Sequence, residues 1–191
     1  MPKSTHKKTQ KIAEDKMTHK EKAKSLYEEG DVEGSIGEYR AALREDPSDA
    51  ASKKALADLL SDEDRLSEAI VEYRALIEID ASDPCAHFGL CDACHKKGMI
   101  DEALVEIKES IRLRPGWPFY HNKKGMLLEE KSDIEGAIKE YEEAIRIKPD
   151  FTVASERLSR LNAIRKNVKR QGAAAGTSGP GRLKKHDNDR D

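Results

Sequence analysis

The fold is decided by residues 118–151, which read PFYHNKKGMLLEEKSDIEGAIKEYEEAIRIKPDF. Shifted by 34 residues at a time, this stretch falls in register with residues 84–117, 50–83 and 16–49. Three columns are apolar in every unit: Ile36, Ile70, Leu104, Ile138; Leu43, Ile77, Ile111, Ile145; and Val32, Leu66, Ile100, Ile134. Self-similarity at a fixed period of this length indicates a stacked-repeat architecture.

Small and bulky residues keep the same period. The small columns are Ala23, Ala57, Cys91, Gly125 and Ser35, Ala69, Ala103, Ala137, and the bulky column is Tyr39, Tyr73, Ile107, Tyr141. Each unit breaks its apolar pattern once, at Gly30, within residues 61–64, and at Gly98. Apolar intervals of three and four on both sides of the break predict two amphipathic helices per unit. The sequence shows no alternation of apolar and polar residues with a period of two, which would predict a strand. We therefore expect an all-α fold.

Helix pairs of 34 residues with small side chains at fixed positions resemble the tetratricopeptide repeat family. The resemblance covers residues 16–151 and implies a right-handed solenoid of four repeats, 16–49, 50–83, 84–117 and 118–151. Closing prolines match at positions 47, 115 and 149, whereas Ala81 replaces the second one. Lys22 and Lys124 occupy an apolar position of the family, so we expect looser packing between the third and fourth units.

The flanking segments differ from the repeats in composition. Residues 152–170 continue the helical apolar spacing and are predicted to form a capping helix, because terminal repeats need a polar outer face. Residues 171–191 are too poor in apolar side chains to fold and are predicted to be a disordered tail. Residues 1–15 form a basic, frayed N-terminal segment in this interpretation.

Charge is abundant and segregated. Charged residues make up 38% of the chain, above the ~25% of typical globular domains. Residues 1–24 hold eight lysines against three acidic residues, and residues 152–191 hold ten basic against four acidic residues. Residues 25–151 carry an excess of thirteen acidic residues, which favours a basic partner or contacts with the chain's own ends.

Targeting signals are not found in the sequence. No stretch approaches the ~20 apolar residues that cross a bilayer, and the opening MPKSTHKKTQ lacks the apolar region of a signal peptide. Three cysteines, clustered within residues 85–94, do not form a spaced disulfide framework. We therefore expect a soluble cytoplasmic protein with no membrane partner.

The segment CDACH at residues 91–95 matches the C-x-x-C-H pattern of covalent haem attachment. The repeat register argues against a cofactor, because Cys91 falls in a small column and Cys94 aligns with leucines, where packing needs a small or apolar residue. The ligands of one zinc ion must lie ~2.0–2.3 Å from it, and these side chains do not converge. We predict no cofactor and no metal. A metal- or redox-responsive role of Cys85, Cys91, Cys94 and His95 is the alternative.

Catalytic and nucleic-acid signatures are also missing from the sequence. There is no glycine-rich phosphate loop, no G-x-S-x-G and no H-E-x-x-H. The acidic middle has no basic stripe with interleaved aromatic residues, which argues against nucleic acid as a partner. We predict a non-enzymatic protein–protein interaction module or scaffold.

The family resemblance places first helices on a concave groove, where a protein or peptide partner would bind. The groove residues chosen as partner-binding are Phe88, Phe119, Asn122, Met126, Asp58, Asp92, Glu129 and Glu130. The two aromatic rings would be anchors, and the acidic rim favours a segment with Lys or Arg. Family members that clamp chaperone C-termini use Lys, Asn and Arg side chains where this chain has Lys20, Lys24, Ala55, Cys85 and Gly89. Only Lys20 matches, so a chaperone C-terminal peptide is not expected.

Overall fold

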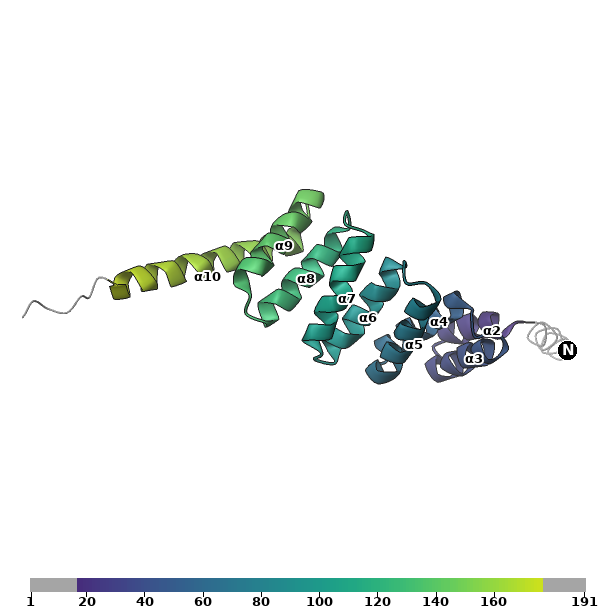
Figure 1. Ribbon diagram of the computed structural model, residues 1–191. Coiled ribbons are helices and arrows are strands. Elements are labelled where there is room, and N and C mark those ends of the chain that lie inside the picture. Colours follow the sequence, from purple (N-terminus) through teal and green to yellow (C-terminus); the bar gives the residue numbers. More distant parts are fainter. Residues whose placement is uncertain (1–16, 177–191) are drawn as a thin grey trace, which may run out of the picture.

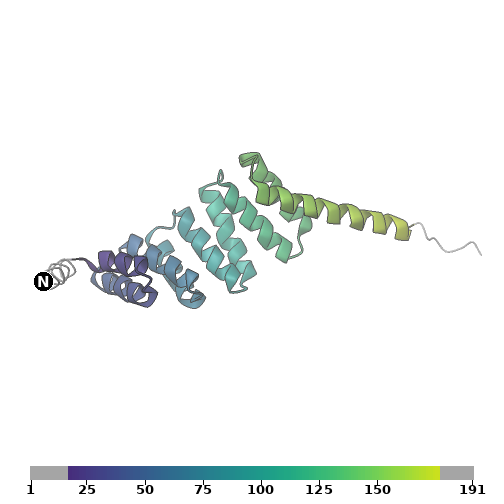
Figure 2. The ribbon, with the colours of Figure 1, turned by 180° about the vertical axis from the view of Figure 1, so that it is seen from behind.

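The computed structural model describes residues 17–176, and all regular structure in that range is helical. The helices are α2 (His19–Glu28), α3 (Val32–Glu45), α4 (Ala50–Asp62), α5 (Leu66–Ile79), α6 (Pro84–Lys96), α7 (Ile100–Leu113), α8 (Pro118–Glu130), α9 (Ile134–Ile147) and α10 (Thr152–Gly176). Successive pairs stack along one axis, and α10 projects from the end of the stack (Figures 1 and 2). The predicted all-α right-handed solenoid with a C-terminal helix is confirmed.

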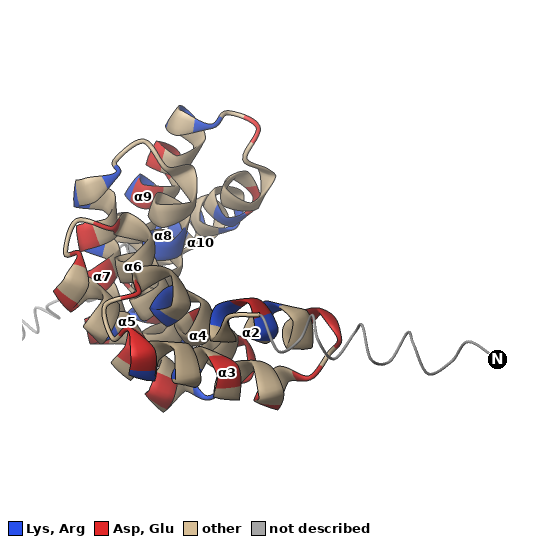
Figure 3. Ribbon diagram, turned by 90° about the vertical axis from the view of Figure 1, so that its right-hand side faces the viewer, with Lys and Arg blue, Asp and Glu red and all other residues tan. Residues whose placement is uncertain are grey.

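The stack is curved, and its two sides are built from different helices. The first helices of neighbouring units are close enough that α4 and α6 touch directly. Viewed along the stack, α4, α6 and α8 lie on the inner side of the curve and α3, α5 and α7 on the outer side (Figure 3). First helices therefore line the concave surface. Among the described residues, no helix combines the length and apolar composition that a bilayer-spanning segment requires.

The small columns are where paired helices approach each other. All the members of the second column, from Ser35 to Ala137, are completely buried, and so are Ala23, Ala57 and Cys91 of the first. A Cβ atom added to Gly125 would lie 2.6 Å from Cε1 of Tyr141, closer than atoms can pack. Small side chains are required here because a larger one would push the helices apart.

The turn inside each unit is left-handed at one repeated position. Gly30 and Gly98 have φ of +84° and +80°, and Asp64 and Ser132 occupy the same position with φ of 58° and 63°. Glycine adopts this conformation without steric cost, whereas a side chain does not. The next helix then begins on a side-chain cap where the residue is aspartate, as when Asp31 accepts from the amide of Gly34 at 2.9 Å.

Second helices end at the same repeat position in every unit, at residues 45, 79, 113 and 147. The second unit does so without a closing proline. There the Asp80 carboxylate accepts from the amide and the hydroxyl of Ser82, at 2.8 and 2.6 Å. The same bonds join Asp46 and Ser48 beside Pro47 in the first unit, so this turn forms with or without the proline ring.

The hydrophobic core is divided within the fourth unit. One cluster runs from Ala23 to Leu127, and a second contains Ala137, Tyr141, Phe151 and Leu161; partly buried Leu128 packs on both. A polar contact lies beside this division: Lys124 of α8 donates to Glu140 of α9 at 2.5 Å. The sequence predicted looser apolar packing at Lys124 between units three and four. In the structure this lysine is satisfied by the ion pair with Glu140 of its own unit.

The last helix is longer than predicted. The boundary proposed at residue 170 is wrong for the described residues, because α10 continues to Gly176 through an alanine run. Ala154 and Leu161 are buried against the fourth unit, whereas Val168, predicted on the same face, is 63% exposed. The packed part of the cap therefore ends near Leu161. The predictions for residues 1–15 and for 177–191 lie outside the described residues.

A cation and a carboxylate join the two helices of every unit. Nδ1 of His19, His87 and His121 lies 2.5, 2.7 and 2.9 Å from Glu38, Glu106 and Glu140, and Nζ of Lys53 lies 3.6 Å from Glu72. Nε2 of His87 and His121 also faces a backbone oxygen, of Ala81 at 3.2 Å and Pro115 at 3.1 Å. With acceptors at both nitrogens, these two rings bond fully only as imidazolium.

The hydrogen bond with Glu140 is the main cause that raises the pKa of His121 above 6.5. Burial opposes ionisation of Glu140, yet His121 and Lys124 hold the pKa of that carboxyl below 4.5. A raised histidine pKa contributes stability that is complete below 6.5 and disappears as pH rises through the folded-state value. A lowered glutamate pKa contributes stability above 4.5. The pair is therefore strongest between those two values.

We predict that His121→Gln destabilises the protein by about 1.5–3 kcal/mol at pH 5.5, the range of a charge-assisted hydrogen bond, and by less above pH 8. The measurement is the free energy of unfolding by urea at several pH values. Lys53→Gln is the matched control, because lysine stays charged over this range and its effect should be flat. A pH-independent effect of His121→Gln would contradict the assignment.

We also predict that Ser132→Gly stabilises the protein by about 0.5–1 kcal/mol, since it relieves a left-handed side chain. The reverse change, Gly98→Ser, should destabilise by a similar amount. Both are read from urea unfolding midpoints. Equal midpoints for wild type and both variants would show that this turn carries no strain.

Candidate functional site

The candidate site is the concave surface, where the predicted residues lie on three first helices. Asp58 belongs to α4, Phe88 and Asp92 to α6, and the other five to α8. Their acidic members were predicted as a free rim. The structure shows instead that each carboxylate already has partners within the described chain.

Asp58 is held by its own unit. One carboxylate oxygen accepts from Nζ of Lys54 at 2.5 Å, and the other accepts from the hydroxyl of Tyr73 at 2.6 Å. Burial is the main cause that raises the pKa of Tyr73, and the Asp58 carboxylate raises it further. The tyrosine therefore remains a donor at neutral pH and fixes the orientation of this carboxylate.

A chain of polar contacts crosses from the third unit to the fourth. Lys123, buried on α8, donates to Asp92 at 2.6 Å and to Nδ1 of His95 at 2.8 Å. Nε2 of His95 lies 2.6 Å from Glu130. Because Nδ1 accepts a hydrogen bond from the Lys123 ammonium group, Nε2 carries the ring hydrogen and donates to the glutamate. Burial opposes ionisation of Asp92, but Lys123 holds its pKa below the usual value.

Glu129 is covered by the capping helix. It accepts from the hydroxyl of Tyr141 at 2.9 Å and pairs with Arg157 at 3.1 Å and Arg160 at 2.6 Å. The C-terminal end of the concave surface is thus closed by arginines from α10. Glu129 is therefore not free to attract a basic partner.

The two predicted aromatic anchors belong to one row of rings but do not form a pair. Half-buried Phe88 packs on Tyr120 with centroids 5.1 Å apart, and Tyr120 lies 6.4 Å from Trp117. Trp117 then lies 5.6 Å from Phe119, which packs on Phe151 at 4.9 Å. Trp117 and Phe119 are both exposed by more than 40%. The repeat register did not predict the contributions of Trp117 and Tyr120, because neither residue has an aromatic counterpart in the other units.

Asn122 has an unfilled hydrogen-bonding position. Its amide nitrogen donates weakly to the sulfur of Met126 at 3.7 Å, whereas Oδ1 is buried and has no partner in the described structure. Asn122 occupies the same repeat position as Phe88, one unit later. A buried, unpaired acceptor is costly unless a ligand donates to it.

The cysteines do not form a site in this structure. Cys91 and Cys94 are buried, and Cys85 is exposed near the hydroxyl of Tyr120. Burial raises the pKa of the Cys91 thiol to about 12 and also raises that of Cys94, so neither is a ready thiolate. Within residues 17–176 no three potential ligands gather in a metal-binding arrangement.

Solved structures with the same fold have low sequence identity to this chain. A crystal structure of MamA is 22% identical, with a TM-score of 0.72, and the match covers 75% of this chain and 84% of MamA. A tetratricopeptide repeat protein from Parabacteroides merdae is 16% identical, with a TM-score of 0.73, over 78% of this chain and 59% of that one. The first such domain of Spaghetti (RPAP3), bound to the HSP90 peptide SRMEEVD, is 17% identical, with a TM-score of 0.59, over 61% and 93%.

These likenesses show the fold. No curated protein gives a significant sequence match. Two family models described as tetratricopeptide repeat match the sequence, over residues 20–84 and 120–151, which together make up half of the chain. The matched segments contain the small residues, the internal turns and the second-helix ends of the first, second and fourth units. The chain belongs to the tetratricopeptide repeat family.

Proposed function

We propose that this protein is a non-enzymatic interaction module that holds an extended protein segment along its concave surface. The fold suits a protein-interaction scaffold, and one structural neighbour is a tetratricopeptide domain with a peptide bound. The observation that carries the proposal is the buried, unpaired Oδ1 of Asn122. A backbone amide of a bound segment would donate to this oxygen once rotation of the half-buried Asn122 amide brings it to the groove surface.

Apolar contacts would flank that hydrogen bond. Phe88 is half-buried on the adjacent first helix, and Met126 lies one turn beyond Asn122. An aromatic ring beside a flexible thioether suits recognition of a peptide side chain. Phe119 lies in the first turn of α8, the helix that also carries Asn122 and Met126, so we propose it as a secondary anchor.

The partner segment is proposed to be basic. Residues 25–151 carry the acidic excess of the chain, although Asp92 and Glu129 are paired internally. An acidic chaperone C-terminal peptide is not expected, because Ala55, Cys85 and Gly89 provide no cationic or amide side chains for a carboxylate. Lys20, the only matching clamp residue, is already paired with Asp49 at 3.0 Å.

The alternative, a metal- or redox-responsive role of the cysteine cluster, has weaker support. Cys91 and Cys94 are core residues, and His95 is engaged by Lys123 and Glu130. Metal content and the absorption spectrum of the purified protein test this alternative directly. Stoichiometric zinc or a haem band would favour it over the groove.

We predict that Phe88→Ala weakens peptide binding by about 1–2 kcal/mol, the usual cost of removing an anchor side chain, and that Phe119→Ala has a smaller effect in the same direction. The probe is a fluorescein-labelled dodecapeptide mixture with arginine fixed at alternate positions, followed by fluorescence anisotropy. Higher salt should weaken the binding. Circular dichroism checks that each variant is folded.

Val105→Ala is the matched control, because Val105 is 61% exposed on α7, an outer helix. The peptide SRMEEVD is the acidic comparison probe and should bind poorly. Wild-type affinity in both phenylalanine variants would place the binding site outside the groove.

A further inference from the structure

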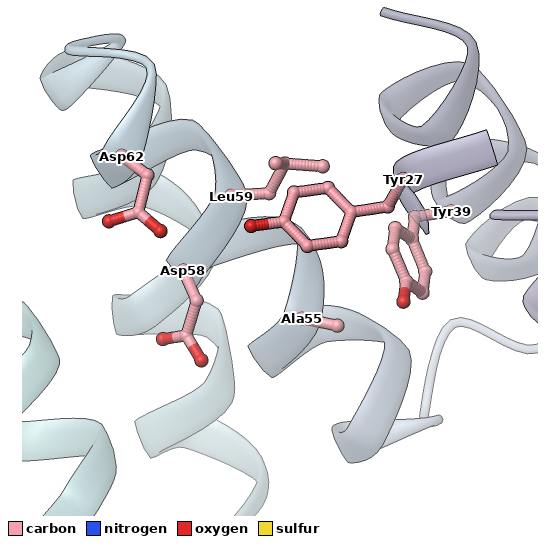
Figure 4. Close-up of a pocket in the computed structure, with 6 residues that line it drawn as sticks. All are labelled: Tyr27, Tyr39, Ala55, Asp58, Leu59 and Asp62. Atoms are coloured by element: carbon pink, nitrogen blue, oxygen red, sulfur yellow. The ribbon is translucent and has the colours of Figure 1, made fainter. Parts of the chain in front are cut away.

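A pocket of about 180 Å³ opens on the concave side between the first two repeats. It is lined by Tyr27, Tyr39, Ala55, Asp58, Leu59 and Asp62. Figure 4 shows Tyr27 reaching across Leu59 with its hydroxyl on the side of the two aspartates. The pocket therefore joins aromatic surface from unit one to carboxylates from α4.

The decisive feature is the hydroxyl group of Tyr39. The tyrosines at the same repeat position in units two and four donate to carboxylates, Tyr73 to Asp58 at 2.6 Å and Tyr141 to Glu129 at 2.9 Å. Tyr39 lines the pocket and is only 6% exposed, but its hydroxyl makes no hydrogen bond within the described residues. A phenol that is nearly buried usually has a partner. The pocket therefore has room for a ligand group next to Tyr39.

Asp62 is the second polar group of the pocket, and its side chain is exposed to solvent. Asp58 is bonded to Lys54 and Tyr73, but Asp62, one helical turn later, makes no ion pair or hydrogen bond within the described residues. Tyr27 is 53% exposed and its ring is accessible from the groove. The pocket thus offers one free carboxylate, one partly neutralised carboxylate and an open aromatic face.

We propose that this pocket binds an arginine side chain of the segment held in the groove. The inference rests on the proposed function, and it identifies the residue type recognised at the N-terminal end. A guanidinium group is planar, stacks on tyrosine and donates from several N–H groups at once. It can therefore stack on Tyr27 and donate either to Asp62 or to the Tyr39 oxygen, which lie on opposite sides of the tyrosine ring (Figure 4). A lysine ammonium group carries the same charge but has no planar group that could stack on the tyrosine ring.

The test uses the full chain and a small probe, N-acetyl-arginine methylamide, titrated into 15N-labelled protein and followed by NMR. Saturable shifts should appear at the amides of Tyr27, Ala55, Leu59 and Asp62. The neutral isostere N-acetyl-citrulline methylamide should bind about threefold or more weakly, since it lacks the charge that a partly exposed carboxylate recognises. The matching lysine probe should bind between the two.

Three variants and one control assign the site. Asp62→Asn, Tyr27→Leu and Tyr39→Phe should each weaken the arginine probe at least about twofold. Glu63→Gln makes the same charge change as Asp62→Asn one residue further on, outside the pocket lining, and should leave binding unchanged. Equal binding of the citrulline probe, or shifts that avoid these residues, would overturn the proposal. Stronger binding of the lysine probe would overturn the choice of arginine.

The chain's own lysine-rich N-terminal segment, residues 1–15, is the competing occupant of the pocket. Replacing Lys3, Lys7, Lys8 and Lys11 by glutamine tests this alternative. A probe that binds only this variant would show that the N-terminal segment fills the pocket, and would overturn the proposal that a partner segment does. The small probes do not depend on the remainder of the groove. Peptide binding that falls in Phe88→Ala but persists in Asp62→Asn would refute the pocket and retain the proposed function.

Discussion

The close approach of two helices in each unit is the constraint on which the rest of this structure depends. Side chains of the small columns are completely buried between the paired helices, and even a methyl group on Gly125 would collide with Tyr141. Because every unit meets this constraint at the same positions, every unit has the same shape. Similar shapes stacked in one register produce a curved array, and first helices line the inner side of that curve.

That constraint also explains which parts of the fold were predictable. Small and apolar columns repeat every 34 residues, so their period could be read without knowing any contact. A column of glutamates has the same period: Glu38, Glu72, Glu106 and Glu140. Its ion pairs could not be predicted, because periodicity does not show which cation faces a carboxylate. The end of α10 was mispredicted for a different reason. Residues 173–175 are alanines, and their helix propensity favours continuation of the helix to Gly176.

The partners of the groove residues could not be predicted from the sequence. Lys123 reaches Asp92 across 31 positions, His95 reaches Glu130 across 35, and Arg160 reaches Glu129 across 31. Such contacts depend on the rotation between neighbouring units, which the period alone does not determine. Repeat register predicted which side chains face inward, but it treated the acidic ones as free. Most of the inner acidic charge instead stabilises the stacking of one unit on the next.

Departures from the period mark the surfaces that remain available to a ligand. A hydroxyl at the position of Tyr39 finds a carboxylate in units two and four, but in unit one the position equivalent to Asp58 is Lys24 and that equivalent to Glu129 is Tyr27. Asn122 lies in a column that has no period, since the other units have Lys20, Lys54 and Phe88 there. Within the described residues, neither the Tyr39 hydroxyl nor Oδ1 of Asn122 makes a hydrogen bond. The proposed partner segment would supply the missing partners of both groups.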